Sequence, residues 1–351
     1  MLRDHADLVE ADPDGDPVVR GQILASFPSE AALSQALALG FSIRRDHRLP
    51  ALGLHLAVLV DPPHWSLGKS LRALRRTIPT GTFDYDQIYF ASGGARAGPR
   101  GDTATPASGE ASRAAHALPA IGLVDTGIDV HDRAFHRSIV HTWGCGGSAH
   151  PAAHGTGVAS LLVRRMPAEL YAADVYCGAP TGGSADALVG ALAWLAQQRV
   201  PVINVSLVGP RNLLLARVVG ALIDRGYVIV AAVGNDGPAA PPLYPAAYPH
   251  VVGVTAVDRD RHVLLEAERG PQVTFAAVGD DLDIATIGDR TQSARGTSFA
   301  APTVAALFAG LMDAPDPNAA AAARATLIRR AIDLGARGWD PIYGYGLLAG
   351  R

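Results

Sequence analysis

From residue 119 onward, short apolar runs alternate with segments of helical pattern, and this alternation constrains the fold most strongly. Apolar runs without a polar face are typical of strands buried on both sides, and the helices between them connect parallel strands. The sequence therefore predicts an α/β fold, a mainly parallel sheet with helices on both faces. The expected strands are 120–124, 169–176, 200–207, 227–233 and 251–257, and the expected helices are 154–164, 184–198, 213–225 and 299–311.

Residues 21–90 follow a different order of elements. Strands are expected at 22–27, 41–45, 55–60 and 83–90, with helices that begin after Pro28-Ser29 and at Ser66. In the second helix, Leu67, Leu71, Leu74 and Ile78 recur at the spacing of one helical face. The order strand-helix-strand-strand-helix-strand predicts a small ferredoxin-like α+β domain. This pattern is common and by itself indicates no function.

The remaining segments and the overall charge limit the other possibilities. Residues 1–20 are charged and rich in Pro and Asp, so they are expected to be a mobile segment, and residues 91–118 read as a linker open to proteolysis. The net charge is −3 and no basic block is present, which argues against a nucleic-acid partner. No apolar run is long enough to predict a membrane span.

Four polar residues stand where the expected strands end or the helices begin. Asp125 ends an apolar strand, His154 begins a helix, Asn235 follows a buried strand, and Ser298 opens an apolar helical run. Sites in parallel sheets form at the carboxyl ends of strands. Each residue alone also has an ordinary interpretation, as a turn residue or a helix cap. A serine at a helix N-terminus, however, lies among unpaired N–H groups that can stabilise an oxyanion.

Together, these four contexts resemble the subtilisin-like serine proteases (subtilases), over about residues 119–350. The matching segments are Val124-Asp125-Thr126-Gly127, His154-Gly155-Thr156-Gly157-Val158-Ala159, Val202-Ile203-Asn204-Val205-Ser206-Leu207, Ala232-Val233-Gly234-Asn235, Tyr244-Pro245-Ala246-Ala247-Tyr248-Pro249, Gly296-Thr297-Ser298-Phe299-Ala300-Ala301-Pro302 and Tyr343-Gly344-Tyr345-Gly346. The chain order Asp, His, Ser is the order known for this family. The resemblance implies a serine endopeptidase, with residues 119–351 as its catalytic domain.

The resemblance also implies a role for each of the four residues. Ser298 would be the nucleophile, His154 the general base, and Asp125 the residue that orients the imidazole. The Asn235 amide would stabilise the oxyanion.

Substrate contacts are implied for two further segments. Ser206, Leu207, Val208 and Gly209 resemble the segment that pairs with an extended peptide substrate. Leu243 occupies the base of the primary specificity pocket, where relatives often have a small residue, so we expect a shallow pocket that prefers small or modest apolar side chains. A cis peptide bond is implied at Tyr244-Pro245.

Subtilase propeptides share the split βαβ order of residues 21–90. The resemblance therefore implies that this unit is an inhibitory and chaperone-like propeptide of a zymogen, with its tail from Ala91 in the active-site cleft. Autoprocessing is expected within 91–118, near Ala91 to Ala97. An unrelated accessory domain is the alternative. For the whole chain, the alternative is a binding or regulatory protein with a protease fold, permanently inhibited by its own N-terminal unit. A dedicated processing protease also fits the sequence.

No cofactor and no metal are expected. After His154, the predicted helix leads through 161–167 directly to the next strand, without the loop that holds a calcium ion in relatives. Cys145 and Cys177 allow one disulfide or two buried thiols. The expected partners are a protein or peptide substrate and the chain's own N-terminal unit, with the protein a monomer. The expected location is periplasmic or secreted, with the cytoplasm left open because no leader sequence is seen.

Overall fold

The computed structural model describes residues 2–92, 94–96 and 118–349. Its main sheet confirms the α/β prediction: seven strands lie in the order β15-β14-β13-β11-β7-β9-β8, and each neighbouring pair is parallel. The strands are β7 (Ala120–Asp125), β8 (Ile139–Trp143), β9 (Glu169–Asp174), β11 (Val202–Val205), β13 (Val228–Ala232), β14 (Val252–Val257) and β15 (Val273–Val278).

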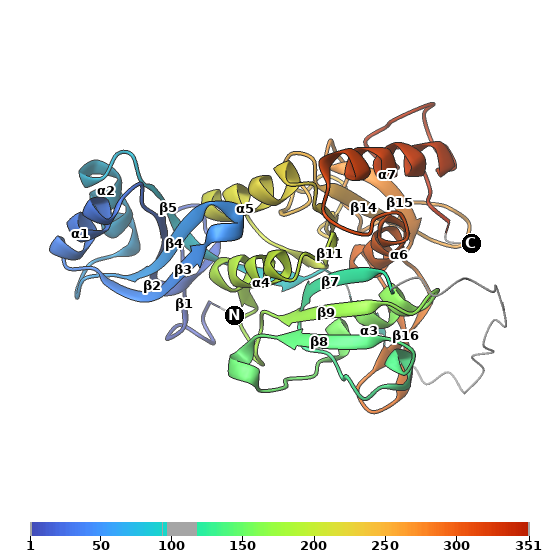
Figure 1. Cartoon of the computed structure of the whole chain (residues 1–351), viewed down its shortest axis with the longest axis horizontal. Helices are drawn as coiled ribbons and strands as arrows, with labels where there is room; N and C mark the ends of the chain where they lie inside the picture. The colour runs from blue at the N-terminus through green and yellow to red at the C-terminus, as the bar shows by residue number, and fades with distance from the viewer. Residues whose placement is uncertain (1, 93, 97–117, 350–351) are drawn as a thin grey trace.

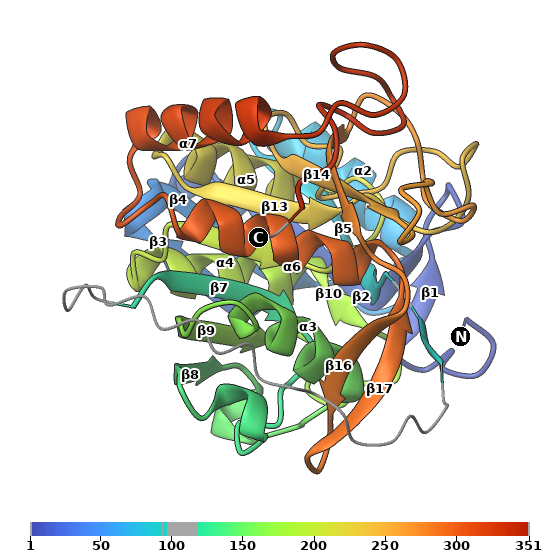
Figure 2. The same ribbon diagram turned by 90° about the vertical axis from the view of Figure 1, so that its right-hand side faces the viewer.

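Helices cover both faces of this sheet (Figures 1 and 2). One face packs on α3 (Ala153–Val163), α6 (Thr297–Ala309) and α7 (Pro317–Arg330), and the other on α4 (Ala185–Gln197) and α5 (Leu213–Asp224). Alternation along β7 explains the two layers, because Ile121 and Leu123 enter the first core whereas Val124 enters the second.

Several elements differ from the sequence prediction. The strand expected at 200–207 is divided into β11 and the short β12 (Leu207–Val208). The hairpin of β16 (Leu282–Thr286) and β17 (Arg290–Arg295), together with β8, β15 and α7, was not predicted. The sequence of β17, Arg-Thr-Gln-Ser-Ala-Arg, has no apolar alternation, so only its partners make it a strand.

The N-terminal unit confirms the predicted order of strands and helices. It consists of β2 (Pro17–Ser26), α1 (Glu30–Ala38), β3 (Ser42–Leu49), β4 (Leu54–Val60), α2 (Leu67–Thr77) and β5 (Thr82–Ala91), with an antiparallel sheet in the order β5-β2-β4-β3. The residues at 67, 71, 74 and 78 are buried as expected. Part of the segment expected to be mobile is instead ordered, since β1 (Val9–Ala11) pairs with β2 and Val9 is buried.

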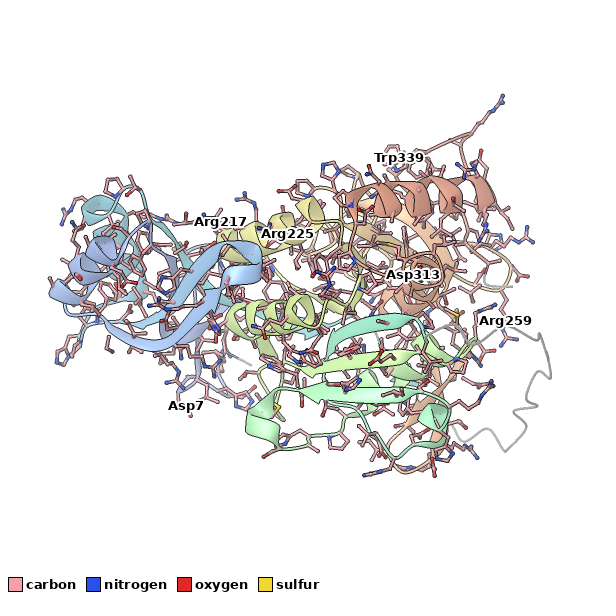
Figure 3. The ribbon with its side chains drawn as sticks, in the orientation of Figure 1. Asp7, Arg217, Arg225, Arg259, Asp313 and Trp339 are labelled. Carbon is pink, nitrogen blue, oxygen red and sulfur yellow. A yellow bond between two sulfur atoms is a disulfide. The ribbon has the colours of Figure 1, made fainter. Side chains whose placement is uncertain are left out.

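The N-terminal unit packs on α4 and α5 (Figure 1). Asp84 Oδ2 of β5 accepts the Leu213 N–H at 2.7 Å, and Asp86 Oδ1 accepts the Asp186 N–H at 2.9 Å. Both N–H groups lie in the first turn of a helix, where a carboxylate is stabilised by unpaired donors and the helix dipole. Arg217 of α5, labelled in Figure 3, donates to the Thr82 hydroxyl at 3.0 Å.

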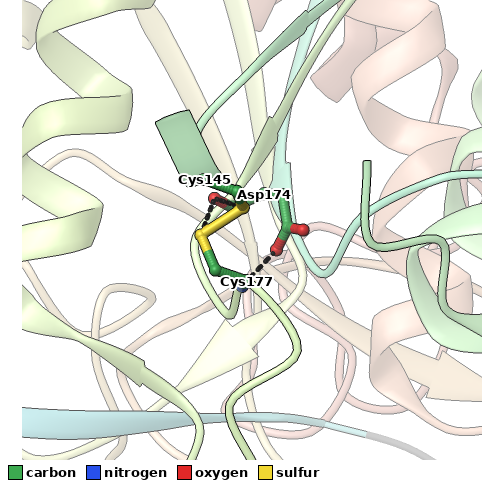
Figure 4. A group of neighbouring side chains, drawn as sticks. All are labelled: Cys145, Asp174 and Cys177. Carbon is green, nitrogen blue, oxygen red and sulfur yellow. Dashed lines mark hydrogen bonds between the residues drawn. A yellow bond between two sulfur atoms is a disulfide. The ribbon is translucent and has the colours of Figure 1, made fainter. Parts of the chain in front are cut away.

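Cys145 and Cys177 form a disulfide, which settles the alternative left open by the sequence (Figure 4). It connects the short 3-10 turn η3 (Cys145–Gly147) to the segment after β9 and closes a loop of 32 residues. A cross-link of this size contributes about 3–4 kcal/mol in the chain-entropy model. The bridge therefore fixes the loop that leads into α3 and His154.

Other short elements complete the description. They are the 3-10 turns η1 (Pro50–Leu52) and η2 (Arg133–Phe135) and the strands β6 (Gly94–Arg96) and β10 (Gly183–Ser184). The peptide bond Tyr244-Pro245 is cis, as predicted. Within the described ranges, no helix has the length and apolar character needed to cross a membrane.

Candidate active site

Asp125 and His154 come together at the carboxyl end of β7, next to the middle strand β11 of the sheet. His154 Nδ1 lies 2.7 Å from Asp125 Oδ1, and the same oxygen accepts the Thr126 N–H at 2.7 Å. Asp125 is fully buried, whereas the His154 side chain is 14% exposed. This arrangement fixes the orientation of the ring and leaves Nε2 directed away from the carboxylate. Across the described part of the chain, Nε2 has no hydrogen-bond partner.

Ser298 lies in the first turn of α6 and is fully buried beneath the N-terminal unit. Its hydroxyl donates to the Ser206 carbonyl at 3.1 Å and contacts the Ser92 carbonyl, while its N–H donates to the Ser92 carbonyl at 3.0 Å. The adjacent Phe299 ring lies 5.3 Å from the His154 ring. In this closed arrangement, the serine hydroxyl is engaged by main-chain carbonyls, including one from the N-terminal unit.

Asn235 is fixed beside Ser298 by the residue that precedes the serine. Its Oδ1 accepts the Thr297 N–H at 3.1 Å, which leaves the NH₂ group directed into the site. That group donates to the Ser92 hydroxyl at 2.7 Å. The Thr297 hydroxyl in turn accepts the Gly234 N–H at 3.3 Å. An amide held in this way is preorganised, because little reorientation is needed to meet a new acceptor.

The tail of the N-terminal unit runs through the site in an extended conformation. Phe90 and Ala91 pair antiparallel with Val208 and Leu207 of β12, and the Ser92 N–H donates to the Ser206 carbonyl at 3.3 Å. On the other side, β5 pairs with β10. Further along the chain, after Ser92, the strand β6 pairs with β17. The segment 206–209 thus lies against a peptide strand, at the place where the sequence predicted substrate pairing.

Tyr89, three positions before Ser92, is packed tightly against the catalytic domain. Its side chain is fully buried, and its hydroxyl donates to the Pro210 carbonyl at 2.8 Å. A Cβ on Gly209 would lie 2.7 Å from the Tyr89 ring, so glycine is required for this contact.

A cavity of about 420 Å³ opens beside Ser92. Its walls from the catalytic side are Val208, Gly209, Pro210, Asn235, Asp236 and Leu243. Asp16 and Pro17 of the N-terminal unit also line this cavity, so the expectation of a shallow pocket at Leu243 stays a prediction. The cavity is large enough for a long side chain.

Glu268 lies behind this cavity and contacts the residues that form or adjoin its walls. It is fully buried; its Oε2 accepts the Leu243 N–H at 3.4 Å, and its N–H donates to the Gly234 carbonyl at 3.2 Å. A Cβ on Gly234 would lie 2.2 Å from Oε1, so the carboxyl group occupies the space that glycine leaves. Burial raises the pKa of Glu268 to about 7, partly offset by the Leu243 N–H.

Replacement of Glu268 by Gln should remove a pH-dependent part of the stability. Because the folded pKa is raised, the neutral form stabilises the fold fully below pH about 4.5, and this contribution is lost as the pH rises to about 7. We expect the variant to gain about 2–3 kcal/mol over wild type above pH 7 and little at pH 4.5. Thermal melts across this range, with the exposed Glu30→Gln as control, measure it. Parallel profiles for wild type and Glu268→Gln would contradict the assignment.

One group of metal-ligating side chains occurs within the described ranges, Cys145, Asp174 and Cys177 (Figure 4). Both sulfur atoms are used in the disulfide, and Asp174 Oδ1 accepts the Tyr176 and Cys177 N–H groups at 2.9 Å. The group therefore acts as a structural link, and the expectation that no metal takes part stays a prediction.

Sequence reasoning missed two contributors to the site. Ser92 lies in the segment in which processing was expected, but no local pattern distinguishes it from its neighbours. Glu268 follows a loop without a recognisable motif, and only its burial against Gly234 and Leu243 reveals it. Thr297 belonged to the quoted serine motif, although its contact with Asn235 could not be inferred.

Comparison with known proteins agrees with these features. Residues 118–346 match the model of the subtilase family. The chain is 28% identical over 245 residues to the minor extracellular protease Epr of Bacillus subtilis, covering 65% of this chain and 37% of that protein. It is 31% identical over 208 residues to subtilisin-like protease 1 of Trichophyton rubrum, covering 54% of this chain and 40% of that protein. The chain thus spans less than half the length of these two relatives.

Solved structures show the same fold. Fervidolysin from Fervidobacterium pennivorans, a keratinolytic enzyme related to subtilisin, aligns with a TM-score of 0.75 at 18% identity, over 97% of this chain and 61% of that one. The prenylagaramide maturation protease PagA aligns with a TM-score of 0.57 at 22% identity, over 65% of this chain and 89% of that one. Since the family model covers most of the chain, and the sheet, its helices and the matched motifs agree with it, the chain belongs to the subtilase family.

Proposed function

We propose that this chain is a serine endopeptidase made as a zymogen, in which Asp125, His154 and Ser298 form the catalytic triad. The observation that carries this proposal is the peptide strand across the site: the Ser92 carbonyl accepts the Ser298 N–H at 3.0 Å beside the Asp125–His154 pair. A carbonyl in this position is the group that a serine nucleophile attacks.

In the proposed reaction, His154 Nε2 takes the proton of the Ser298 hydroxyl as Oγ forms a bond to the substrate carbonyl carbon. The Ser298 N–H and the Asn235 amide stabilise the negative oxygen. His154 then returns the proton to the amine as the peptide C–N bond breaks. Water attacks the acyl-enzyme in the same way and releases the new carboxylate. Asp125 holds the ring and stabilises the imidazolium.

The N-terminal unit is proposed to be the propeptide, and the bond after Ser92 the processing site. Asp84 and Asp86 bind the starts of α5 and α4, and β5 continues directly into the site, so one surface both docks the unit and places its tail. Processing in the rest of 91–118 was also expected, but residues 97–117 lie outside the described ranges. The slow folding of a parallel, non-local sheet gives such a unit a further task as a chaperone.

The location and assembly stay proposals as well. A disulfide between Cys145 and Cys177 supports an oxidising compartment, and therefore a periplasmic or secreted protein. The name of the Bacillus relative, an extracellular protease, agrees with this. A monomer, and a dedicated processing role, rest on the sequence prediction alone.

A fluorophosphonate probe tests the proposed activity. We expect it to label the protein once the N-terminal unit has been removed, with the label mapped by mass spectrometry to the peptide that contains Ser298. The same preparation should contain a fragment that ends at Ser92. An intact chain that never reacts with the probe would favour the alternative, a permanently inhibited regulatory protein.

Replacement of Asn235 by Ala should lower kcat by about 10²–10³-fold with a smaller change in KM, because the amide acts on charge that develops in the transition state. Steady-state hydrolysis of a peptide substrate by the processed protein measures this. The exposed Asn318→Ala on α7 is the control and should match wild type. An unchanged kcat for the Asn235 variant would exclude it as an oxyanion donor.

A further inference from the structure

The hydroxyl of Ser92 accepts a hydrogen bond from the Asn235 amide, which is the donor that the proposed reaction needs for its oxyanion. Asn235 Nδ2 donates to Ser92 Oγ at 2.7 Å, and Oγ also lies 3.1 Å from the Thr297 hydroxyl. Ser92 is only 4% exposed, so these contacts with protein groups nearly enclose its side chain. Within the described ranges, the hydrogen bonds of the Ser92 carbonyl come from Ser298, and the amide meets the hydroxyl instead.

The amide cannot turn freely to serve both acceptors. Its Oδ1 is bound to the Thr297 N–H at 3.1 Å, which fixes the plane of the group. Moving the NH₂ donor from the hydroxyl to the carbonyl oxygen would leave a buried hydroxyl with one partner fewer, which is unfavourable. The NH₂ group has two N–H donors, but its contact with Ser92 goes to Oγ, so the hydroxyl and the developing oxyanion compete for the N–H that faces Ser92.

We propose that the Ser92 hydroxyl slows cleavage of the bond that follows it, and that the site for this reason selects against serine immediately before the cleaved bond. This inference rests on the proposed protease function and deepens it. The chain's own tail is then bound as a substrate but cut as a poor one, so the N-terminal unit persists as an inhibitor.

The cavity beside Ser92 indicates which substrates escape this restraint. The serine side chain is directed to Asn235 and Thr297, and about 420 Å³ remains open next to it. Val208 and Leu243 offer apolar surface there. A longer side chain without a hydroxyl, such as leucine, can extend into this cavity, which Asp16 and Pro17 of the N-terminal unit also line, and leaves the amide free. The favoured substrates are accordingly peptides with a long, hydroxyl-free side chain before the cleaved bond.

Three variants of the full chain test the proposal: Ser92→Ala, Ser92→Thr and Ser92→Leu. Unfolded precursor is refolded by dilution, and the fraction cut after residue 92 is followed by mass spectrometry. We expect self-cleavage of Ser92→Ala to be about 10–100-fold faster than wild type, a fraction of the effect of an oxyanion donor. Ser92→Thr retains the hydroxyl and should be as slow as wild type, whereas Ser92→Leu should be at least as fast as Ser92→Ala.

A double-variant cycle separates the competition for the amide from other effects. In an Asn235→Ala background, Ser92→Ala should no longer accelerate cleavage, because the contested donor is gone. The same replacements in a Ser298→Ala background, compared by circular dichroism, show whether they change refolding. Equal rates for wild type and Ser92→Ala, or equal acceleration in both backgrounds, would overturn the proposal. No cut after residue 92 in any variant would instead remove the proposed function, and the inference with it.

Discussion

Replacement of Ser298 by Ala should leave the full chain uncut and lower peptide hydrolysis by about 10⁶-fold. Ser298 is the residue whose N–H and hydroxyl both contact the Ser92 carbonyl, which makes it the candidate nucleophile. The Thr297 hydroxyl accepts the Gly234 N–H and contacts Ser92, which holds it away from the role of nucleophile. Mass spectrometry of the purified variant should give one species of full-length mass.

The variant should still fold, because alanine is tolerated in the first turn of a buried helix such as α6. A matched control is Ser148→Ala in the exposed loop before α3, which should cut itself as wild type does. Fragments ending at Ser92 in Ser298→Ala preparations would mean that another protease cuts this bond. Residual hydrolysis within tenfold of wild type would exclude Ser298 as the nucleophile.

Replacement of Asp125 by Asn should lower kcat by about 10⁴-fold. The asparagine keeps the shape of the side chain and can still accept the Thr126 N–H through its oxygen. The same oxygen can still accept from His154 Nδ1, but the neutral amide no longer stabilises the imidazolium that forms when His154 takes the proton of Ser298.

The pH dependence distinguishes this explanation from a loss of structure. Activity of Asp125→Asn should recover in part at strongly alkaline pH, where hydroxide assists removal of the serine proton, and the circular dichroism spectrum should match wild type. The exposed Asp313→Asn, labelled in Figure 3, is the control for the loss of one carboxylate. Wild-type kcat in Asp125→Asn would remove Asp125 from the proposed triad.

Local patterns account for the features that could be predicted from the sequence. Strands such as β7 and β13 are apolar on both faces, and helices such as α4 have their apolar residues on a helical period, so both are apparent without tertiary information. Asp125, His154, Asn235 and Ser298 could be proposed as site residues because each is embedded in a short motif at the end of an element. These residues are expected at the same edge of the sheet because parallel strands all end at that edge.

Features that depend on contacts distant in sequence could not be predicted. β17 is polar and becomes a strand by pairing with β16 and β6, which lie on opposite sides of it. The side chain of Leu243 is expected to limit the pocket, but the sequence alone does not show that residues of the N-terminal unit line the same cavity. Ser92 is one small residue in a stretch of small residues, and its contact with Asn235, 143 positions away, exists only in the folded chain.

Strand pairing on both sides of Ser92 determines how the two new chain ends would behave if the proposed cut after Ser92 takes place. Upstream, β5 is bound to β2, β10 and β12, and downstream, β6 is bound to β17. Cutting the bond between them frees neither end, and the new carboxyl terminus stays opposite Ser298 at a high effective concentration. Under the proposed zymogen function, activation would then depend on dissociation of the whole N-terminal unit from the rest of the protein. Dilution, or digestion of the unit by a second protease molecule, would release the enzyme.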